Sequence, residues 1–440
     1  MKKNEESWYY TFLPYNIAGG STSPLIPLFV TEGLKGSLTQ VGIVSAISSI
    51  ASVPGNILWG NLSDTTKKRR PFVLLGFGGM AFALFMMAIS TTISSYYLAN
   101  FFFGLLACAA APVGTVLVLE SFGKHEWARR LGDFSKVGGI GWVAGLILGS
   151  LWLEFMPGAK ESVFSLRGLF LVASLLALAS LFLALKWVPE PEEKVRREHI
   201  EKNILDQPLI VFEKVKYFPH RLLHILRIST RNLSMRNFPS NLKKYYIMTF
   251  LAFTGFLTFY VGLPIYLRNY VGISNSEVFV VFLASSAVSA ITYSIAGRWV
   301  ARFGGKKTQL AAFVGRIVLF PSFFAVTFLP LTKEWLIITL CILHGLIGFC
   351  WANLSVAGNA LVSNMSYSEF RTESLGIYSA IQGLGSIMGS FIGGIIAEYF
   401  GFFATFVIAS LFVLCAAIIL MILDVEKGPS EQADQHAIHT

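Results

Sequence analysis

Charged residues are scarce in this sequence. Only 14% of its 440 residues are Asp, Glu, Lys or Arg, whereas a soluble protein carries about 25%. Hydrophobic residues make up 54%, and the mean hydropathy is +0.62. This balance excludes an ordinary water-soluble domain and favours a chain that crosses a membrane repeatedly. A net charge of +10 could indicate nucleic-acid binding. We expect no nucleic-acid partner, however, because the cations are distributed over many loops and do not form one patch.

Cysteine and the common catalytic motifs are also scarce. The four cysteines all lie inside apolar runs, without metal-type spacing: Cys108, Cys341, Cys350 and Cys415. We therefore expect buried thiols and no metal site. The sequence contains no G-x-S-x-G, no P-loop and no H-E-x-x-H pattern. It predicts no enzyme, no catalytic residue, no cofactor and no ATP-driven pump.

Long apolar runs are abundant. A membrane-spanning helix needs about 20 mostly apolar residues, because about 30 Å of hydrocarbon is crossed at about 1.5 Å per residue. Twelve runs meet this need, at approximately 9–30, 38–60, 71–91, 95–119, 132–153, 167–187, 245–268, 276–297, 308–329, 334–361, 374–396 and 401–423. Barrel strands would instead alternate in polarity over about 10 residues. The expected fold class is an all-α membrane protein with twelve transmembrane helices.

Lys and Arg are distributed unevenly among the loops. With both termini in the cytoplasm, 29 of the 35 cations lie on the cytoplasmic side, 5 lie outside and Arg316 lies within a span. Short cytoplasmic loops carry an excess of Lys and Arg. The sequence therefore predicts a multi-pass protein of the cell membrane with both termini inside. We expect the Arg316 side chain to extend its charge to the membrane surface.

The runs divide six and six around a charged segment. We predict an N-terminal six-helix bundle over 1–187, a cytoplasmic linker over 188–243, a C-terminal bundle over 244–424 and a cytoplasmic tail over 425–440. Within the linker, residues 209–233 mix apolar and basic positions at roughly helical spacing. This segment is either an amphipathic helix on the lipid surface or a solvated linker.

The two halves of the sequence resemble each other. Residues 131–155 align with residues 375–399 at a constant offset of 244. Glycines recur every four positions, on one face of each helix: Gly141, Gly145, Gly149, Gly385, Gly389 and Gly393. Small residues at this spacing let helices approach closely, either in static packing or as a sliding gate. Two like-oriented repeats predict pseudo-symmetric bundles with a substrate site between them, near the membrane midplane.

The loop between the second and third runs carries a distinctive pattern, WGNLSDTTKKRRPF, over residues 59–72. It resembles a major facilitator superfamily signature, G-x-L-x-D-R-x-G-R-R/K, with matches at Gly60, Leu62, Asp64, Lys68 and Arg69 and departures at Thr65 and Lys67. A partial second copy keeps Gly297, Arg302, Gly304 and Lys306, with Ala301 in the place of the acid. The resemblance covers residues from about 10 to 424. It implies the superfamily's fold of two six-helix bundles and transport by alternating access.

Asp64 suggests a second role for that loop besides fixing topology. A carboxylate near the positive N-terminus of a neighbouring helix contributes about 0.3–1 kcal/mol, or about 2 kcal/mol when partly buried. The resemblance implies that this neighbour is the eleventh helix, which we expect to begin near Ser374. Such a latch would favour the outward-open state. The simpler interpretation is that the cations alone anchor the loop.

The superfamily architecture implies a cavity lined foremost by helices 1, 4, 7 and 10. Polar groups inside a membrane turn toward the bundle interior or a cavity, or they hydrogen-bond between helices. The expected cavity residues are Asn16, Ser23, Asn100, Thr254, Tyr260, Tyr293, His344, Trp351, Asn353 and Gln382, with Ser285 and Ser289 as further candidates. Trp351 and the many Phe predict an aromatic wall suited to amphipathic molecules.

Pro24 and Pro27 resemble the P-x-x-P pattern of the drug–proton antiporter branch, whereas Asn100 stands where that family usually has Arg. The resemblance therefore implies a transporter that exports amphipathic compounds. An importer or facilitator of a small polar metabolite, a non-transporting membrane sensor and a membrane-embedded enzyme are the alternatives. Direction, coupling ion and substrate stay open. The expected partners are a small-molecule substrate and the lipid bilayer, and we expect a monomer.

Proton coupling needs a titratable group inside the membrane. Every Asp and Glu falls at a helix end or in a loop or tail, including Glu120 and Asp133. The candidates are therefore His344, in the tenth apolar run, or a bordering carboxylate such as Asp133. The sequence predicts coupling that is weak or absent, or that runs through one of these two groups.

Overall fold

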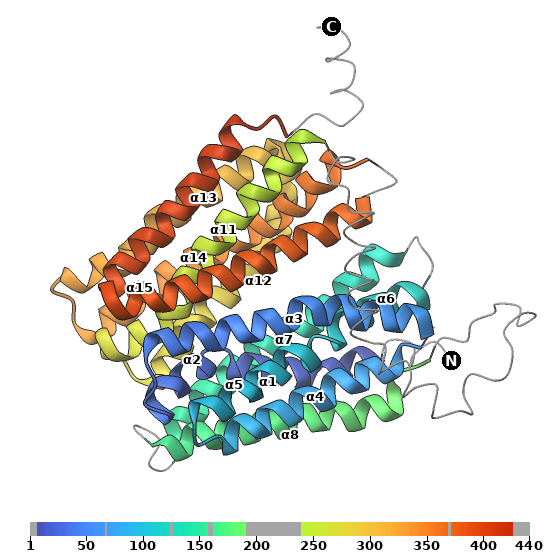
Figure 1. The fold of residues 1–440 in the computed structure, drawn as a ribbon, viewed down its shortest axis with the longest axis horizontal. Coiled ribbons are helices and arrows are strands. Elements are labelled where there is room, and N and C mark those ends of the chain that lie inside the picture. Colours follow the sequence, from blue (N-terminus) through green and yellow to red (C-terminus); the bar gives the residue numbers. More distant parts are fainter. Residues whose placement is uncertain are drawn as a thin grey trace, which may run out of the picture.

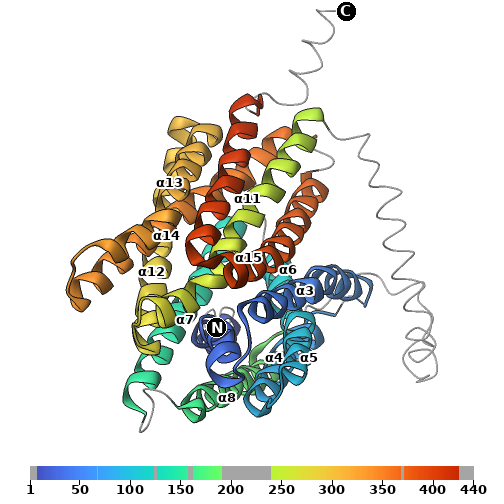
Figure 2. The same cartoon turned by 60° about the vertical axis from the view of Figure 1, so that its left-hand side comes forward.

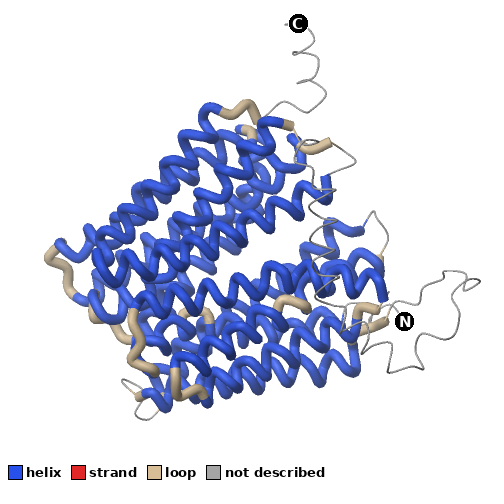
Figure 3. The backbone as a smooth tube through the Cα atoms, in the orientation of Figure 1, coloured by secondary structure: helices blue, strands red, loops and turns tan. Residues whose placement is uncertain are grey.

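The computed structural model describes residues 7–66, 68–122, 126–156, 162–190, 239–367 and 371–425. Within these residues the chain is nearly all helical and contains no strand (Figure 3). The segment 209–233 and the tail beyond residue 425 lie outside the described part, so the expectations for them stay predictions.

The N-terminal half contains the elements η1 (Ser7–Thr11), α1 (Phe12–Thr22), α2 (Leu25–Leu28), η2 (Phe29–Gly33), α3 (Leu38–Thr66), α4 (Arg70–Ile89), α5 (Ile93–Phe102), η3 (Phe103–Ala107), α6 (Ala110–Ser121), α7 (Trp127–Phe155) and α8 (Val163–Trp187). The C-terminal half contains α11 (Ser240–Ile265), η6 (Tyr266–Tyr270), α12 (Asn275–Phe303), α13 (Gly305–Ala325), η7 (Val326–Phe328), α14 (Lys333–Met365) and α15 (Arg371–Ile422). Figure 2 shows the blue-to-green half beside the yellow-to-red half.

The twelve expected spans are confirmed, although the first, the fourth and the last two differ from separate, uninterrupted helices. Among the described residues, ten helical segments are long and apolar enough to cross a membrane. The first expected span is missing from these ten because it is broken between α1 and α2, at Ser23 and Pro24. Pro24 has no N–H to donate, and its ring clashes with the carbonyl four residues earlier.

The other two differences have similar local causes. The fourth span contains the π-helical turn η3 and a break before α6, where Pro112 lies in the first turn. The last two spans form one element, α15, which changes direction at Gly401 with φ +79°. Only glycine adopts this backbone conformation readily, so the two helices connect without a loop.

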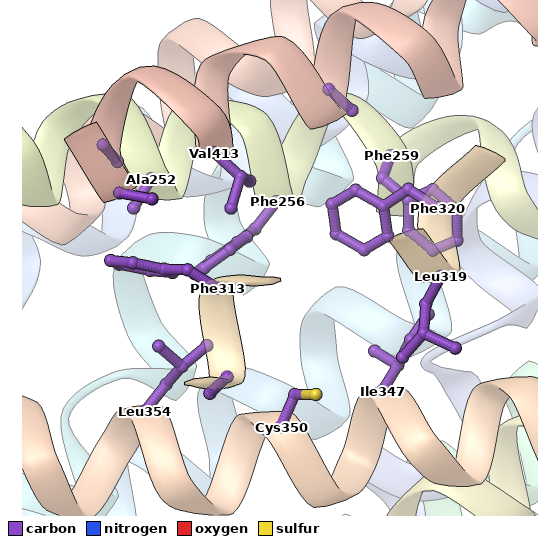
Figure 4. Close-up of a cluster of buried hydrophobic side chains, with 14 of the residues drawn as sticks. Ala252, Phe256, Phe259, Phe313, Leu319, Phe320, Ile347, Cys350, Leu354 and Val413 are labelled. Atoms are coloured by element: carbon purple, nitrogen blue, oxygen red, sulfur yellow. The ribbon is translucent and has the colours of Figure 1, made fainter. Parts of the chain in front are cut away.

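Each half has its own core, and helix packing between the halves is symmetric. In the C-terminal half, Phe259 stacks on Phe320 with ring centroids 4.1 Å apart (Figure 4). Between the halves, α3 packs on α15 and α7 packs on α12. The second and fifth spans of one half thus contact the eleventh and eighth spans of the other, as a pseudo-twofold axis requires.

Candidate functional site

The two halves are in close contact at one end of the bundle, which we call the closed end. The Glu398 carboxylate accepts hydrogen bonds from the backbone N–H groups of Leu38 at 2.6 Å and Thr39 at 3.4 Å. One turn further, Gly42 of α3 lies against Ser390 and Gly394 of α15, where a Cβ would meet the Ser390 carbonyl oxygen. Bare backbone is therefore needed where the two helices meet.

An ion pair joins the halves at the same end. Glu32 Oε1 lies 2.6 Å from Arg268 Nε, and its other oxygen accepts a hydrogen bond from Asn275 Nδ2 at 2.7 Å. Nearby, the Ser150 hydroxyl lies 3.1 Å from the Ser276 hydroxyl, across the contact between α7 and α12. These contacts seal the closed end with polar groups from both halves.

The halves diverge toward the other end, which carries the loops 66–70 and 303–307 and which we call the basic end (Figure 1). Two contiguous cavities occupy the space between them. One has a volume of about 570 Å³ and lies among α1, α2, α3, α5, α11, α12 and α14. The other, of about 1140 Å³, extends along α7, α11 and α12. Both are lined by Trp142, Leu257, Tyr260, Ser285 and Ser286.

Most of the residues expected at the site line these cavities. The structure places Asn16, Ser23, Asn100, Tyr260, His344 and Ser285 on the smaller cavity and Tyr260, Tyr293, Trp351, Ser285 and Ser289 on the larger one. They come from both halves of the chain, so neither half alone forms the site.

Two buried polar atoms at the smaller cavity have no hydrogen-bond partner among the residues that the structure describes. Asn100 donates from Nδ2 to the Tyr96 carbonyl at 2.9 Å, whereas its Oδ1 is unpaired. His344 Nδ1 lies 3.0 Å from the Val281 carbonyl, and its Nε2 is unpaired. A carbonyl oxygen only accepts, so in the neutral imidazole Nδ1 carries the hydrogen and Nε2 is an acceptor. Unpaired buried acceptors are costly, which favours a bound molecule that donates to them.

Three of the expected residues lie elsewhere. Thr254 donates to the Phe250 carbonyl, and its own carbonyl packs against Gly389, so it belongs to the contact between α11 and α15. Asn353 lines a separate hollow among α12, α13 and α14. Gln382 lines a smaller cavity, of about 180 Å³, next to Trp351. Their depth in the membrane was predictable from the sequence, but the helix face on which they lie was not.

Comparison with known proteins places this architecture in a family. The sequence profile of the Major Facilitator Superfamily matches residues 11–235 and 245–440. This chain belongs to the Major Facilitator Superfamily.

Two relatives of this superfamily member illustrate a distant similarity along most of the chain. "Multidrug resistance protein MdtG" of Escherichia coli O9:H4 (strain HS) is 21% identical over 420 residues, which cover 94% of this chain and 92% of the relative. MdtG of Enterobacter lignolyticus (strain SCF1) is also 21% identical, with 94% and 90% covered.

Solved structures share the superfamily fold. A variant of the nucleoside transporter NupG superposes with a TM-score of 0.74 at 15% identity, covering 95% of this chain and 98% of that one. A D-xylose-proton symporter superposes with a TM-score of 0.68 at 14% identity, covering 96% and 98%.

The superfamily signature forms an ion-pair network at the basic end. Arg69 is only 5% exposed, and it donates from Nε and Nη2 to the Glu120 carboxylate at 2.8 and 2.5 Å and from Nη1 to the Ser63 hydroxyl at 2.7 Å. The Glu190 carboxylate accepts from the backbone N–H groups of Arg69 and Arg70. Arg69 thus ties the start of α4 to the ends of α3, α6 and α8.

The other residues of the two signature copies have different surroundings. Lys68 is exposed, and a Cβ on Gly60 or Gly297 would meet nothing within 4 Å. The exposed Arg302 lies over the Phe303 ring, and Lys306 Nζ donates to the carbonyls of Met421 and Leu423 at the end of α15. The Asp64 side chain lies outside the described part, so the latch stays a prediction.

The repeated glycines pack mostly within each half. Gly141 and Gly145 lie against α1, and Gly385, Gly389 and Gly393 lie against α11, each facing backbone atoms. Gly149 instead meets the Phe279 ring of the opposite half. The pattern therefore marks close packing of helices 1 with 5 and 7 with 11, with only Gly149 at the contact between halves.

The expectation for Arg316 was wrong. Its side chain is 0% exposed and does not extend to the membrane surface. The guanidinium lies over the Phe256 ring, 4.0 Å from the centroid, and 5.6 Å from the Trp351 ring. α13 turns this position toward the interior of the C-terminal half, and a side chain enclosed by α11 and α14 has no path to water.

Sequence reasoning also missed several residues of the site. Trp142 lines both cavities, Gly42 and Gly394 form a close backbone contact between α3 and α15, and Glu32 pairs with Arg268. Gly394 follows Gly393 directly in the sequence. Two adjacent glycines point to different sides of a helix, and this pair was the one feature of the sequence that indicated close packing on a second face of α15. The other contacts join segments more than 200 residues apart and leave no local pattern.

Proposed function

We propose that this protein exports amphipathic organic molecules from the cytoplasm as a secondary transporter. The observation that carries the proposal is the pair of contiguous cavities between the halves, which reach the basic end while the opposite end is closed. Alternating access works by rocking two such repeats about a site between them. Trp142, Phe253 and Trp351 give the larger cavity an aromatic wall, which suits amphipathic compounds. The name of the MdtG relatives agrees with this direction.

We place the protein in the cell membrane, with the basic end and both termini on the cytoplasmic side, on the positive-inside rule. The conformation is then inward-open, with bundles over 1–187 and 244–424 joined by a cytoplasmic linker. Both walls of the cavity come from one chain, so we propose a monomer. Single cysteines in the loop 188–243, probed in intact cells with an impermeant thiol reagent, test this placement. Labelling from outside would contradict it.

The export proposal can be tested in everted membrane vesicles with two amphipathic dyes of opposite charge, the cation ethidium and the anion carboxyfluorescein. We expect energised vesicles containing the protein to accumulate at least one of these dyes above vesicles from the empty host. Ser286 lines both cavities, so Ser286→Trp should abolish the accumulation by filling their junction. Val314, on the exposed surface of α13, gives the matched control, because Val314→Trp should leave accumulation unchanged. Equal accumulation in all samples would refute export of such compounds.

The second candidate function is import or facilitated passage of a small polar metabolite. The unpaired Asn100 Oδ1 and His344 Nε2 favour it, because a polar substrate can donate to both. The fold neighbours transport a nucleoside and a sugar by their names. Uptake of radiolabelled uridine or xylose into right-side-out vesicles distinguishes this function from export. No flux of any kind would favour a non-transporting sensor.

We propose that proton coupling, if present, runs through His344 or Asp133. His344 faces the cavity without a carboxylate partner among the described residues, and Asp133 lies near the basic end of α7, 4.0 Å from Arg129. Substrate-dependent proton flux in proteoliposomes tests this assignment. Stoichiometric flux that survives His344→Gln and Asp133→Asn together would refute it.

A further inference from the structure

Arg316 is a buried cation without a counter-ion in the described part of the chain. None of its three guanidinium nitrogens has a hydrogen-bond partner among the described residues, and its side chain is 0% exposed. Aromatic rings surround it instead: Phe256 at 4.0 Å, Trp351 at 5.6 Å, Tyr260 at 5.9 Å and Phe320 at 5.9 Å from Cζ to the centroids.

The aromatic contacts replace only part of what the guanidinium loses on burial. A cation over a ring face is attracted by the ring's quadrupole. A guanidinium also has five N–H donors that require acceptors, however, and a ring face satisfies them poorly. An ionisable group kept inside a membrane segment at such a cost indicates a functional site.

The rings that enclose Arg316 are also walls of the cavities. Phe256 and Trp351 line the larger cavity, and Tyr260 lines both. The guanidinium is therefore one side-chain layer from the space where a substrate binds. Over this distance, across a layer of aromatic rings, the charge acts strongly on the cavity.

The described lining of these cavities carries no negative charge to offset this field. It contains no Asp or Glu, and its one charged residue is Lys136, on α7 toward the basic end. The separate cavity of about 180 Å³ beside Gln382 also has no charged residue among its described lining residues. Arg316 and Lys136, the two cations at these cavities, thus both attract negatively charged molecules.

We propose that the substrate is an organic anion, with an oxyanion group that pairs with Arg316 and an aromatic or apolar body that lies on Trp142 and Trp351. This inference rests on the proposed transport function and names its substrate class. A guanidinium forms two parallel hydrogen bonds with a carboxylate or phosphate. Rotation of the Tyr260 or Trp351 ring would let the oxyanion in the cavity reach the Arg316 guanidinium. An inside-negative membrane potential also drives an anion outward, so export needs no titratable acid within the span.

Binding of two probes that differ only in charge tests the proposal. Dansylglycine carries a carboxylate, and dansylglycinamide has the same body without charge. Titration of the purified full-length protein, followed by energy transfer from tryptophan to the dansyl group, reports binding near Trp142 and Trp351. We expect the carboxylate to bind about tenfold more tightly than the amide, the preference that one nearby charge confers in a partly screened site.

Variants at Arg316 assign that preference to the guanidinium. Arg316→Met should remove the preference while amide binding stays within about twofold of wild type, which also shows that the variant is folded. Arg316→Lys keeps the charge and should retain part of the preference. Arg298, exposed on α12 and outside the cavity lining, gives the matched control, because Arg298→Met should change neither affinity.

Two results would overturn the inference: equal binding of the two probes by the wild-type protein, or a carboxylate preference that persists in Arg316→Met. Ethidium export without binding of either probe would also overturn it and would leave the proposed function standing. If neither probe binds and neither ethidium nor carboxyfluorescein is exported, both proposals fail.

Discussion

The Glu398 carboxylate caps the first turn of α3 from the opposite half of the molecule. It accepts from the N–H groups of Leu38 and Thr39, while Ser37 and Gln40 satisfy the next positions by a reciprocal capping pair. A helix begins with N–H groups that have no partner within the helix, and its N-terminus attracts negative charge. The closed end is therefore held partly by a bond that must break when the halves separate there.

Loss of the Glu398 charge should favour opening of the closed end. Glu398→Gln removes a helix-terminus interaction of about 0.3–1 kcal/mol, which corresponds to a shift of about two- to fivefold. In a background without the native cysteines, Ser45→Cys at the cavity should react correspondingly faster with an impermeant thiol reagent added outside. Glu154 is the repeat equivalent of Glu398 and is exposed, so Glu154→Gln is the control that should change nothing. Equal rates in both variants would show that the cap is not part of the gate.

Gly42 should control the same equilibrium by steric contact. A methyl group there would meet the Ser390 carbonyl of the other half, so Gly42→Ala should also speed outside labelling of Ser45→Cys without lowering the unfolding temperature. Gly389→Ala should instead destabilise the protein, because its methyl group meets the Thr254 backbone within one half. Overpacking of this kind costs about 1–3 kcal/mol. Gly297→Ala, in open space, should affect neither measurement.

The pair of Arg69 with Glu120 should contribute to stability at the basic end. Arg69→Ala removes hydrogen bonds to a charged partner and leaves a partly buried carboxylate, with an expected loss of about 1–3 kcal/mol. Thermal unfolding of the purified protein in detergent measures this loss. Arg69→Met combined with Glu120→Gln should restore part of it, because both charges are then absent. Lys68→Ala, at an exposed neighbour, should leave the midpoint unchanged, and an equal loss there would show a general effect of loop charge.

Arg316 should be a cost to stability rather than a contribution. Replacing an uncompensated buried charge by an apolar side chain of similar length is neutral or stabilising, so Arg316→Met should unfold at the same or a higher temperature than wild type. Arg167 provides the contrast, because its guanidinium donates to the carbonyls of Ala88 and Ser90 at 2.6 Å. Arg167→Met should lower stability by about 1–3 kcal/mol. A marked loss of stability in Arg316→Met would mean that the contacts between Arg316 and the surrounding aromatic rings stabilise the fold.

The sequence by itself determined the number of helices and their division into two similar halves. Hydropathy is a property of consecutive residues, so a run of about 20 apolar residues marks a span whatever its neighbours are. The glycine repeat was equally local, and it correctly indicated close helix packing, because backbone contact needs small residues at fixed spacing. Pro24 and Gly401 also had local effects, but a hydropathy count does not register a break or a turn inside an apolar run.

Only the tertiary structure decided which side of each helix faces the cavity. In water an amphipathic pattern shows the buried face, but lipid and protein interior are both apolar, so a membrane helix lacks that pattern. For this reason the sequence placed Thr254 and Asn353 with Tyr260, and it expected Arg316 at the membrane surface. The contacts of Glu398 with Leu38 and of Gly42 with Gly394 depend on how the two halves meet. Such contacts are set by long-range docking, which leaves no periodic trace in the sequence.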